Sequence, residues 1–259
     1  MHDIEMHEVS EDFARCWQAA GRHVQAHMQG ASNSWLKKDL NPPFLEHLSF
    51  RLGNQLFYIR IEDQDGALGV PGGRRGLLSV AEGCKGHACI MPMRSKAGAW
   101  VPCESGWGLV DARTGRGIDP PALISAERIE MTDWELQDFA VQIVRDQLEK
   151  SGRKLMSWQG NPAVDPSIWF VGDAGPEWVV VRAVRYPRVE APPPANWHQI
   201  AERCAALSSA GHFASVSVAN GDDAFDLSGT VPPEPLWRGH GLSARFEGLV
   251  SVPHQETGL

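Results

Sequence analysis

Four soft metal ligands lie within a short stretch of the chain: Cys84, His87, Cys89 and Cys103. Four such ligands are what a structural zinc ion needs. The spacing Cys-x₂-His-x-Cys is unusual for a zinc site, since His87 and Cys89 would share one face of an extended strand while Cys84 would lie in a turn. Alternatively, the cysteines are small buried hydrophobes. The sequence therefore predicts that zinc is absent.

A glycine-rich tract, Gly66 to Gly76, invites comparison with phosphate-binding loops. It lacks the Gly-Lys-Ser/Thr ending of a P-loop and the Gly-x-Gly-x-x-Gly spacing of dinucleotide sites. We expect an exposed loop, in which Arg74 and Arg75 could still meet an anion.

Nucleophilic catalysis has little local support in the sequence. No Gly-x-Ser-x-Gly elbow is present, and the ten histidines are scattered along the chain. His212 precedes an apolar strand, where it could face the same cleft as Asp165. We interpret it as a polar cap of that strand.

The elements that must position any site are clearest between Trp134 and Asn220. An amphipathic helix is predicted over 133–150, with Thr132 or Asp133 as N-cap and Gly152 as its end. Apolar patterning then predicts strands at 167–171 and 178–186, a helix at 196–209 and a last strand that ends at Asn220.

This order of elements resembles the restriction-endonuclease-like nucleases, or PD-(D/E)XK nucleases, and within them the Mrr-like branch. In that branch a helix precedes a strand that bears an Asp, and a second strand bears Glu-x-Lys or Gln-x-Lys. The resemblance implies that Asp165, directly before an apolar strand, is the metal-binding Asp. It also implies that Arg182 stands where the family has its Lys.

The motif implied by this resemblance is incomplete. With Arg182 at the Lys position, the acidic or amide position is Val180; moving the motif to Arg185 places Ala183 there instead. A Mg²⁺-dependent phosphodiesterase needs at least two oxygen ligands on the metal and a cation that offsets developing charge. Arginine also stays protonated, so it is a poor proton-handling substitute for lysine.

Two functions remain open. In the first, the nuclease-like frame has lost its chemistry and the chain is a binding or regulatory module without a cofactor. In the second, it is a divergent Mg²⁺-dependent nuclease. That nuclease would use Glu135 on the preceding helix and Asp165 as metal ligands, together with Arg182, and Glu177 could approach from the start of the second strand.

The N-terminal half has a plan of its own. A helix from Ser10 to His27, a turn at Asn41-Pro42-Pro43, a β-hairpin that turns at Gly53-Asn54 and further short strands are predicted. We therefore expect an α+β protein with a small α+β domain with β-hairpins over 1–125. Residues 126–259 would form a restriction-endonuclease-like α/β domain with a central mixed sheet flanked by helices. The sequence shows no internal repeat.

Composition bears on partners and compartment. The formal net charge is −8 and the pI about 5.7, which disfavours nucleic acid and favours a protein partner, although Arg182, Arg185 and Arg188 could form a local basic strip. No basic leader and no apolar run of about 20 residues is seen, so membrane insertion is not expected. Five cysteines without a leader fit reduced thiols in the cytoplasm.

Overall fold

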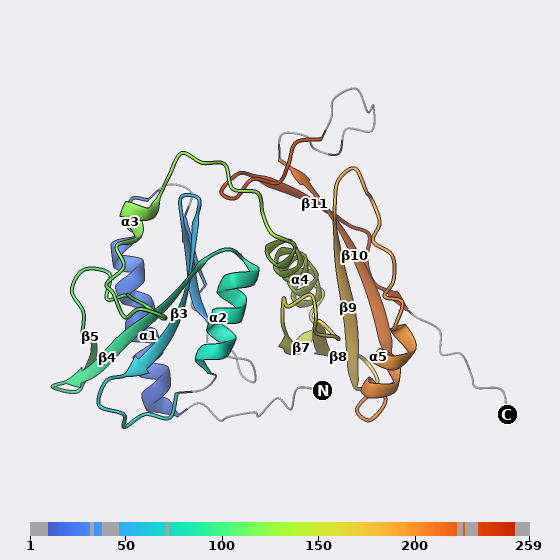
Figure 1. Ribbon diagram of the computed structural model, residues 1–259. Helices are drawn as coiled ribbons and strands as arrows, with labels where there is room; N and C mark the ends of the chain where they lie inside the picture. Colours follow the sequence, from blue (N-terminus) through green and yellow to red (C-terminus); the bar gives the residue numbers. More distant parts are fainter. Residues whose placement is uncertain are drawn as a thin grey trace. The chain divides into compact units, whose positions relative to one another are not determined.

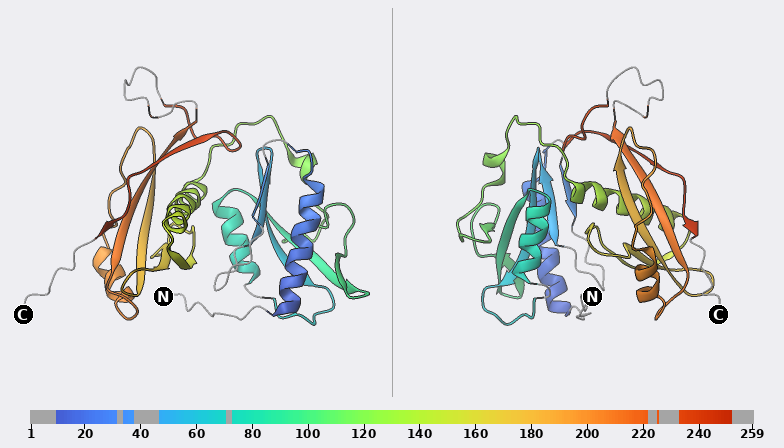
Figure 2. Two further views of the ribbon diagram at one scale, coloured as in Figure 1. Left: turned by 180° about the vertical axis from the view of Figure 1, so that it is seen from behind. Right: turned by 45° about the vertical axis from the view of Figure 1, so that its right-hand side comes forward.

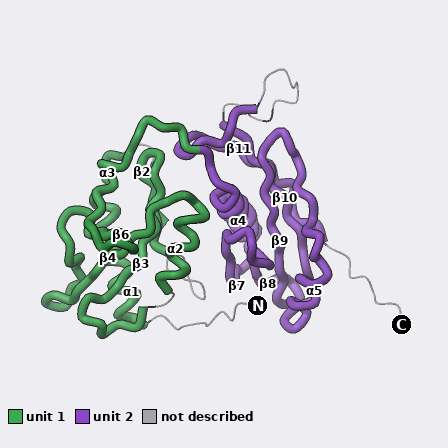
Figure 3. The backbone as a smooth tube through the Cα atoms, viewed as in Figure 1, with its two compact units in different colours: residues 1–129 green, residues 130–259 purple. Residues whose placement is uncertain are grey.

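The computed structural model describes residues 10–31, 34–37, 47–70, 73–221, 225 and 233–251. The chain divides into two compact units, Met1–Ile129 and Glu130–Leu259 (Figure 3), called here the first and the second unit. Each unit combines helices with one mixed sheet, so the predicted α+β class is confirmed. The turn predicted at Asn41-Pro42-Pro43 lies outside the described residues. Within the described ranges, no helix has both the length and the apolar character to cross a membrane.

The first unit has one sheet with a helix on each face (Figure 1 and Figure 2). Its described strands run in the order β1-β2-β3-β4-β5, with β6 beside β4, and among these described pairs only β3–β4 is parallel. In chain order the elements are α1 (Glu11–His27), β1 (Trp35–Lys37), β2 (Leu48–Leu52), β3 (Gln55–Asp63), α2 (Arg74–Gly83), β4 (His87–Lys96), β5 (Ala99–Pro102), β6 (Val110–Asp111) and α3 (Pro120–Leu123).

Local signals account for α1 and for the first hairpin. The Ser10 hydroxyl accepts a hydrogen bond from the Phe13 N–H at 3.1 Å, which satisfies one of the free amides of the first turn. Gly53 has a φ of +58°, a conformation that glycine adopts without strain, and it turns β2 into β3 as predicted. Both predicted elements are confirmed.

The prediction of a loop up to Gly76 is wrong, because α2 begins at Arg74. Gly73 is its N-cap, and the helix buries Leu77 and Ala81. Packing of these two side chains against the sheet compensates for the low helix propensity of Gly76. The Arg74 guanidinium binds Glu62 through two hydrogen bonds of 3.0 and 2.8 Å, so the side chain suggested for an anion already has a carboxylate partner.

The second unit is a sheet in the order β11-β10-β9-β8-β7, with β12 beside β10. Its first helix packs its buried stripe on one face, over Val179 and Val181, and its second helix packs on the other, over Val180 and Val184 (Figure 1). In chain order the elements are α4 (Asp133–Lys150), β7 (Lys154–Trp158), β8 (Ile168–Val171), β9 (Pro176–Arg185), α5 (Trp197–Cys204), β10 (Gly211–Asn220), β11 (Leu242–Phe246) and β12 (Val250–Ser251).

The predicted elements between residues 133 and 220 all form. The helix over 133–150 has the expected bounds, and Thr132 is its N-cap. The strands expected at 167–171 and 178–186 are β8 and β9, and the expected last strand is β10. The helix expected over 196–209 is shorter, because α5 ends at Cys204.

The two units share one topology, although no repeat is visible in the sequence. Each consists of a helix, three antiparallel strands, a second helix and a strand parallel to the third, followed by two strands antiparallel to that one. The buried stripes of the first helices also have the same spacing. It comprises Phe13, Cys16, Trp17, Ala20 and Val24 in α1, and Gln137, Ala140, Val141, Val144 and Leu148 in α4.

Strand register extends this correspondence to single residues. In the first unit Ile59 pairs with Leu48 on one side and Cys89 on the other, as Val179 pairs with Ile168 and His212 in the second. The outermost short strands agree as well. Cys89 pairs with Asp111 of β6, and His212 pairs with Ser251 of β12. The chain is therefore a structural tandem repeat in which positions of one unit can be assigned to the other.

One titration in the first unit gives a prediction for its stability. Burial, and then the charge of Arg60, lower the pKa of His47 to about 4, below the roughly 6.5 of an exposed histidine. The unfolded chain therefore binds the proton first, so stability that is present above pH 6.5 is lost as the pH falls towards 4. We expect a loss on the order of 1–2 kcal/mol between pH 7 and pH 5. Hydrogen exchange of β3, corrected for its intrinsic pH dependence, measures it, and His47→Gln should remove it.

Candidate functional site

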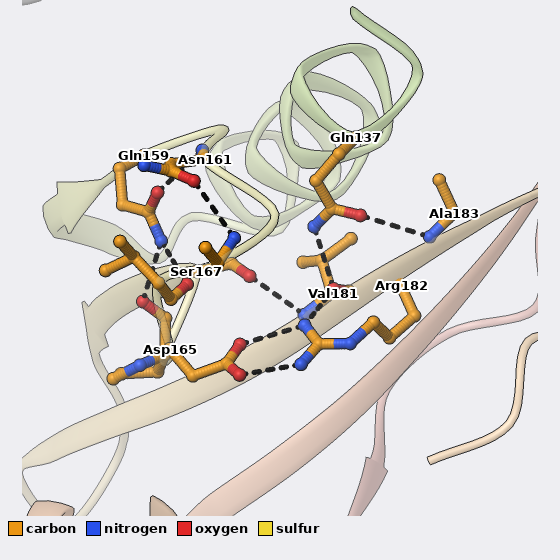
Figure 4. Close-up of polar contacts among 11 residues, drawn as sticks. Gln137, Gln159, Asn161, Asp165, Ser167, Val181, Arg182 and Ala183 are labelled. Atoms are coloured by element: carbon orange, nitrogen blue, oxygen red, sulfur yellow. Dashed lines mark hydrogen bonds and ion pairs between the residues drawn. The ribbon is translucent and has the colours of Figure 1, made fainter. Parts of the chain in front are cut away.

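Asp165 and Arg182 meet in an ion pair with two hydrogen bonds, the arrangement drawn in Figure 4. Arg182 Nη1 lies 2.8 Å from Asp165 Oδ1, and Arg182 Nη2 lies 2.6 Å from Asp165 Oδ2. The Asp165 side chain is only 10% exposed and that of Arg182 is 23% exposed. Sequence reasoning assigned both residues to one site, and the structure brings them together, but each occupies the other's hydrogen-bonding groups.

Side chains replace a missing strand beside Arg182. β8 pairs with β9 only as far as Val179, and no strand within the described ranges pairs with the next part of β9 on that side. The Ser167 hydroxyl accepts from the Val181 N–H at 3.1 Å. Gln137 of α4 donates to the Val181 carbonyl at 2.8 Å and accepts from the Ala183 N–H at 3.2 Å (Figure 4). These bonds fix the backbone on which Arg182 stands.

The loop that carries Asp165 is held in a similar way. Gln159 donates to the carbonyls of Val164, at 2.5 Å, and Pro166, at 3.3 Å, and accepts from the Asn161 N–H at 2.7 Å. The Gln159 side-chain amide thus bridges the loop that carries Asp165 and fixes the position of the Asp165 carboxylate. The charge of this carboxylate reaches the α5 face of the sheet. There, burial raises the pKa of the Cys204 thiol to about 11; the charge of Arg203 opposes this shift, and the charge of Asp165 adds to it.

Val180, at the position where the nuclease motif requires an acid or amide, is fully buried among apolar side chains. The repeat gives this position a counterpart: Val180 and Arg182 correspond to Arg60 and Glu62 of β3. Glu62 is paired with Arg74 and Arg60, and the hydrogen bonds from Arg74 and then from Arg60 lower the pKa of its carboxyl group against the opposing effect of burial. Both units therefore have an ion-paired residue at this position of the strand, which is the acidic Glu62 in the first unit and the basic Arg182 in the second.

Glu135 has two other tasks. It closes the capping box of α4, in which its carboxylate accepts from the Thr132 N–H at 2.9 Å while the Thr132 hydroxyl accepts from the Glu135 N–H. It also forms two hydrogen bonds with Arg238, of 2.8 and 2.7 Å, and this pair is almost completely buried. Arg238 comes from a distant segment, and sequence reasoning missed it.

Glu177 lies on the opposite face of β9 from Arg182. Their positions, 177 and 182, differ by the odd number 5, and alternate residues of a strand face opposite sides. Glu177 Oε2 lies 2.7 Å from His212 Nε2 instead. The four residues proposed for a nuclease site therefore fall into three separate clusters: Asp165 with Arg182, Glu135 with Arg238, and Glu177 with His212.

The cysteine and histidine cluster is dispersed into the packing of the first unit. Cys84 and Cys89 are buried, and burial raises the pKa of the Cys89 thiol. His87 Nε2 lies 3.0 Å from Gln55 Oε1. In the portion of the chain that the structure describes, no group of three or more His, Cys, Asp or Glu side chains is arranged to hold a metal ion.

Comparison with known proteins gives one match. Residues 134–252 match a family model described as a domain of unknown function, DUF8840. No curated protein and no solved structure matches the chain. The matched stretch begins in α4 and extends just past β12, so it lies within the second unit and contains all three ion-pair clusters. Thr132, the N-cap of α4, lies just before it.

Proposed function

We propose that the second unit is a restriction-endonuclease-like frame without phosphodiesterase chemistry, and that the chain serves as a binding or regulatory module for a protein partner. The observation that carries this proposal is the pairing of every candidate carboxylate. Asp165 and Glu135 each have an arginine with two hydrogen bonds, so a divalent cation would have to displace a guanidinium from either one. The order of helix, antiparallel strands, helix and parallel strand supports the likeness in frame.

The choice of a protein partner rests on charge. The net charge is −8, and two of the three arginines in the basic strip considered for nucleic acid already have carboxylate partners, whereas Arg188 is exposed. Arg182 is paired with Asp165, and Arg185 is paired with Asp133 and lies 3.6 Å from Glu130. A phosphate backbone would have to compete with these carboxylates for each guanidinium.

Nuclease assays test the first part of the proposal. We expect no Mg²⁺- or Mn²⁺-dependent cleavage of single- or double-stranded DNA by the purified full chain, measured with labelled oligonucleotides. Wild type is compared with folded Asp165→Ala and Glu135→Ala variants. Cleavage that disappears in both variants would establish the alternative, a divergent Mg²⁺-dependent nuclease that uses Glu135, Asp165 and Arg182, with Glu177 as a further candidate.

A separate experiment tests the kind of partner. The tagged full chain is purified from its own cells with and without nuclease treatment. The proposal expects a stoichiometric protein that stays bound after nuclease treatment. Retention of nucleic acid alone, or loss of the bound protein once nucleic acid is digested, would contradict it.

A further inference from the structure

Glu177, His212 and Ser251 form a polar cluster across three neighbouring strands, β9, β10 and β12. His212 Nε2 lies 2.7 Å from Glu177 Oε2, and His212 Nδ1 lies 3.4 Å from Ser251 Oγ. The side chains of Glu177 and His212 are 20% and 16% exposed, and Ser251 is exposed. The interpretation of His212 as a simple strand cap is therefore wrong, since it lies between a carboxylate and a hydroxyl group.

The two ring nitrogens of His212 have different partners, and this sets their roles. A carboxylate can only accept, so the neutral ring donates its Nε2–H to Glu177 and leaves Nδ1 as an acceptor. Nδ1 then faces the Ser251 hydroxyl. A nucleophile, a base that can take its proton and a group that orients the base are the three parts of an activated hydroxyl. The 3.4 Å separation is long for a bond that transfers a proton, but such bonds commonly tighten when substrate binds.

The tandem repeat shows that the frame does not require polar residues here. By strand register, Glu177 and His212 occupy the positions of Phe57 and Cys89 in the first unit. Both first-unit side chains are fully buried in the apolar core. Corresponding positions of the two sheets thus hold two hydrophobic side chains in the first unit and an ionisable pair in the second. Withdrawing polar groups from water costs free energy. A functional role explains why the costlier pair is present.

Neighbouring residues hold the carboxylate in place. A Cβ atom at Gly172 would lie 1.8 Å from Glu177 Oε1, so the carboxylate occupies space that only glycine leaves free. The Phe170 ring lies with its centroid 6.0 Å from that of His212, in a tilted arrangement. Gly172 is therefore a positioning residue for Glu177.

We propose that Ser251 is an activated nucleophile, with His212 as its base and Glu177 as the orienting group, and that it accepts acyl groups from small, accessible esters. Ser251 Oγ bonds to the acyl carbon while His212 Nδ1 takes the hydroxyl proton. The bond from the acyl carbon to the alcohol oxygen then breaks, and the proton passes to the departing alkoxide. Water repeats the sequence and releases the acid. Neither Asp165 nor Arg182 takes part, so this inference stands or falls separately from the proposed function.

A fluorophosphonate probe tests the nucleophile directly, because it forms an oxygen–phosphorus bond with an activated serine and releases fluoride. We expect one adduct per full chain by intact mass, mapped to Ser251, and its loss in Ser251→Ala. Ser95→Ala removes another exposed strand serine and should label at the wild-type rate. Circular dichroism melts confirm that each variant is folded.

Rates of labelling distinguish an activated serine from a merely accessible one. Glu177→Gln and Gly172→Ala should each slow labelling at least about tenfold, and Glu177→Asp should recover part of the loss. The inference is overturned if wild type is not labelled at Ser251. It is equally overturned if folded Glu177→Gln and Gly172→Ala label at the wild-type rate.

Discussion

Arg238→Met is expected to destabilise the second unit by about 3–5 kcal/mol, the usual loss when one partner of a buried ion pair is removed. The Arg238 and Glu135 side chains are 2% and 9% exposed, so the remaining carboxylate would be buried without its cation. Methionine keeps much of the length of the arginine side chain, which limits the contribution from an empty cavity. Urea denaturation followed by circular dichroism measures the change.

Two further variants check that the effect comes from an unpaired charge. Glutamine at position 135 can keep the capping box while removing the charge, so the Glu135→Gln, Arg238→Met double variant should be more stable than Arg238→Met alone. Arg153→Ala breaks an ion pair with Asp173, which is 89% exposed, and should cost no more than about 1 kcal/mol. A double variant that is less stable than Arg238→Met would contradict the explanation.

Gly211→Ala is expected to destabilise the second unit by about 1–3 kcal/mol through overpacking. A Cβ atom at this position would lie 2.3 Å from Cζ2 of Trp178. The indole cannot easily retreat, because it is fully buried and donates its N–H to the Ser208 carbonyl at 3.1 Å. Alanine suits a strand better than glycine does, so a loss of stability would have to come from the contact with Trp178. Thermal melting measures it.

Gly241→Ala is the matched control in the same unit. A Cβ atom there meets nothing within 4 Å, and Gly241 is not among the glycines with positive φ. Its melting temperature should equal or exceed that of wild type. If Gly211→Ala also melts at the wild-type temperature, Trp178 does not pack tightly against Gly211.

The elements that the sequence predicts best are those with local signals. Helix α4 has both its cap, Thr132, and its buried stripe within its own residues, and its bounds match the prediction. Helix α2 forms in a glycine-rich tract because Leu77 and Ala81 are buried against strands that precede and follow it in sequence. That stabilisation comes from tertiary packing, so the residues of α2 alone do not predict it.

The features of the candidate site likewise divide into those that local sequence could predict and those that depend on tertiary contacts. Strand alternation alone could have shown that Glu177 and Arg182 face opposite sides of β9. The pairing of Glu135 with Arg238 joins segments that are far apart in the sequence, and nothing local predicts it. The repeat was invisible for a related reason. Register is a property of backbone hydrogen bonds, and corresponding side chains differ as much as Cys89 and His212 do.

Tandem domains with one topology are liable to misassembly, because a strand of one can dock in the other during folding. Here β10 placed beside β3 would pair His212 with Ile59 and put Phe57 in the place of Glu177, so the carboxylate that binds His212 Nε2 in the native sheet would be missing. An unsatisfied buried polar group costs about 1–3 kcal/mol, so such a hybrid sheet would be less stable than either native one. The sequence differences between the two units thus also favour the pairing of each strand within its own sheet.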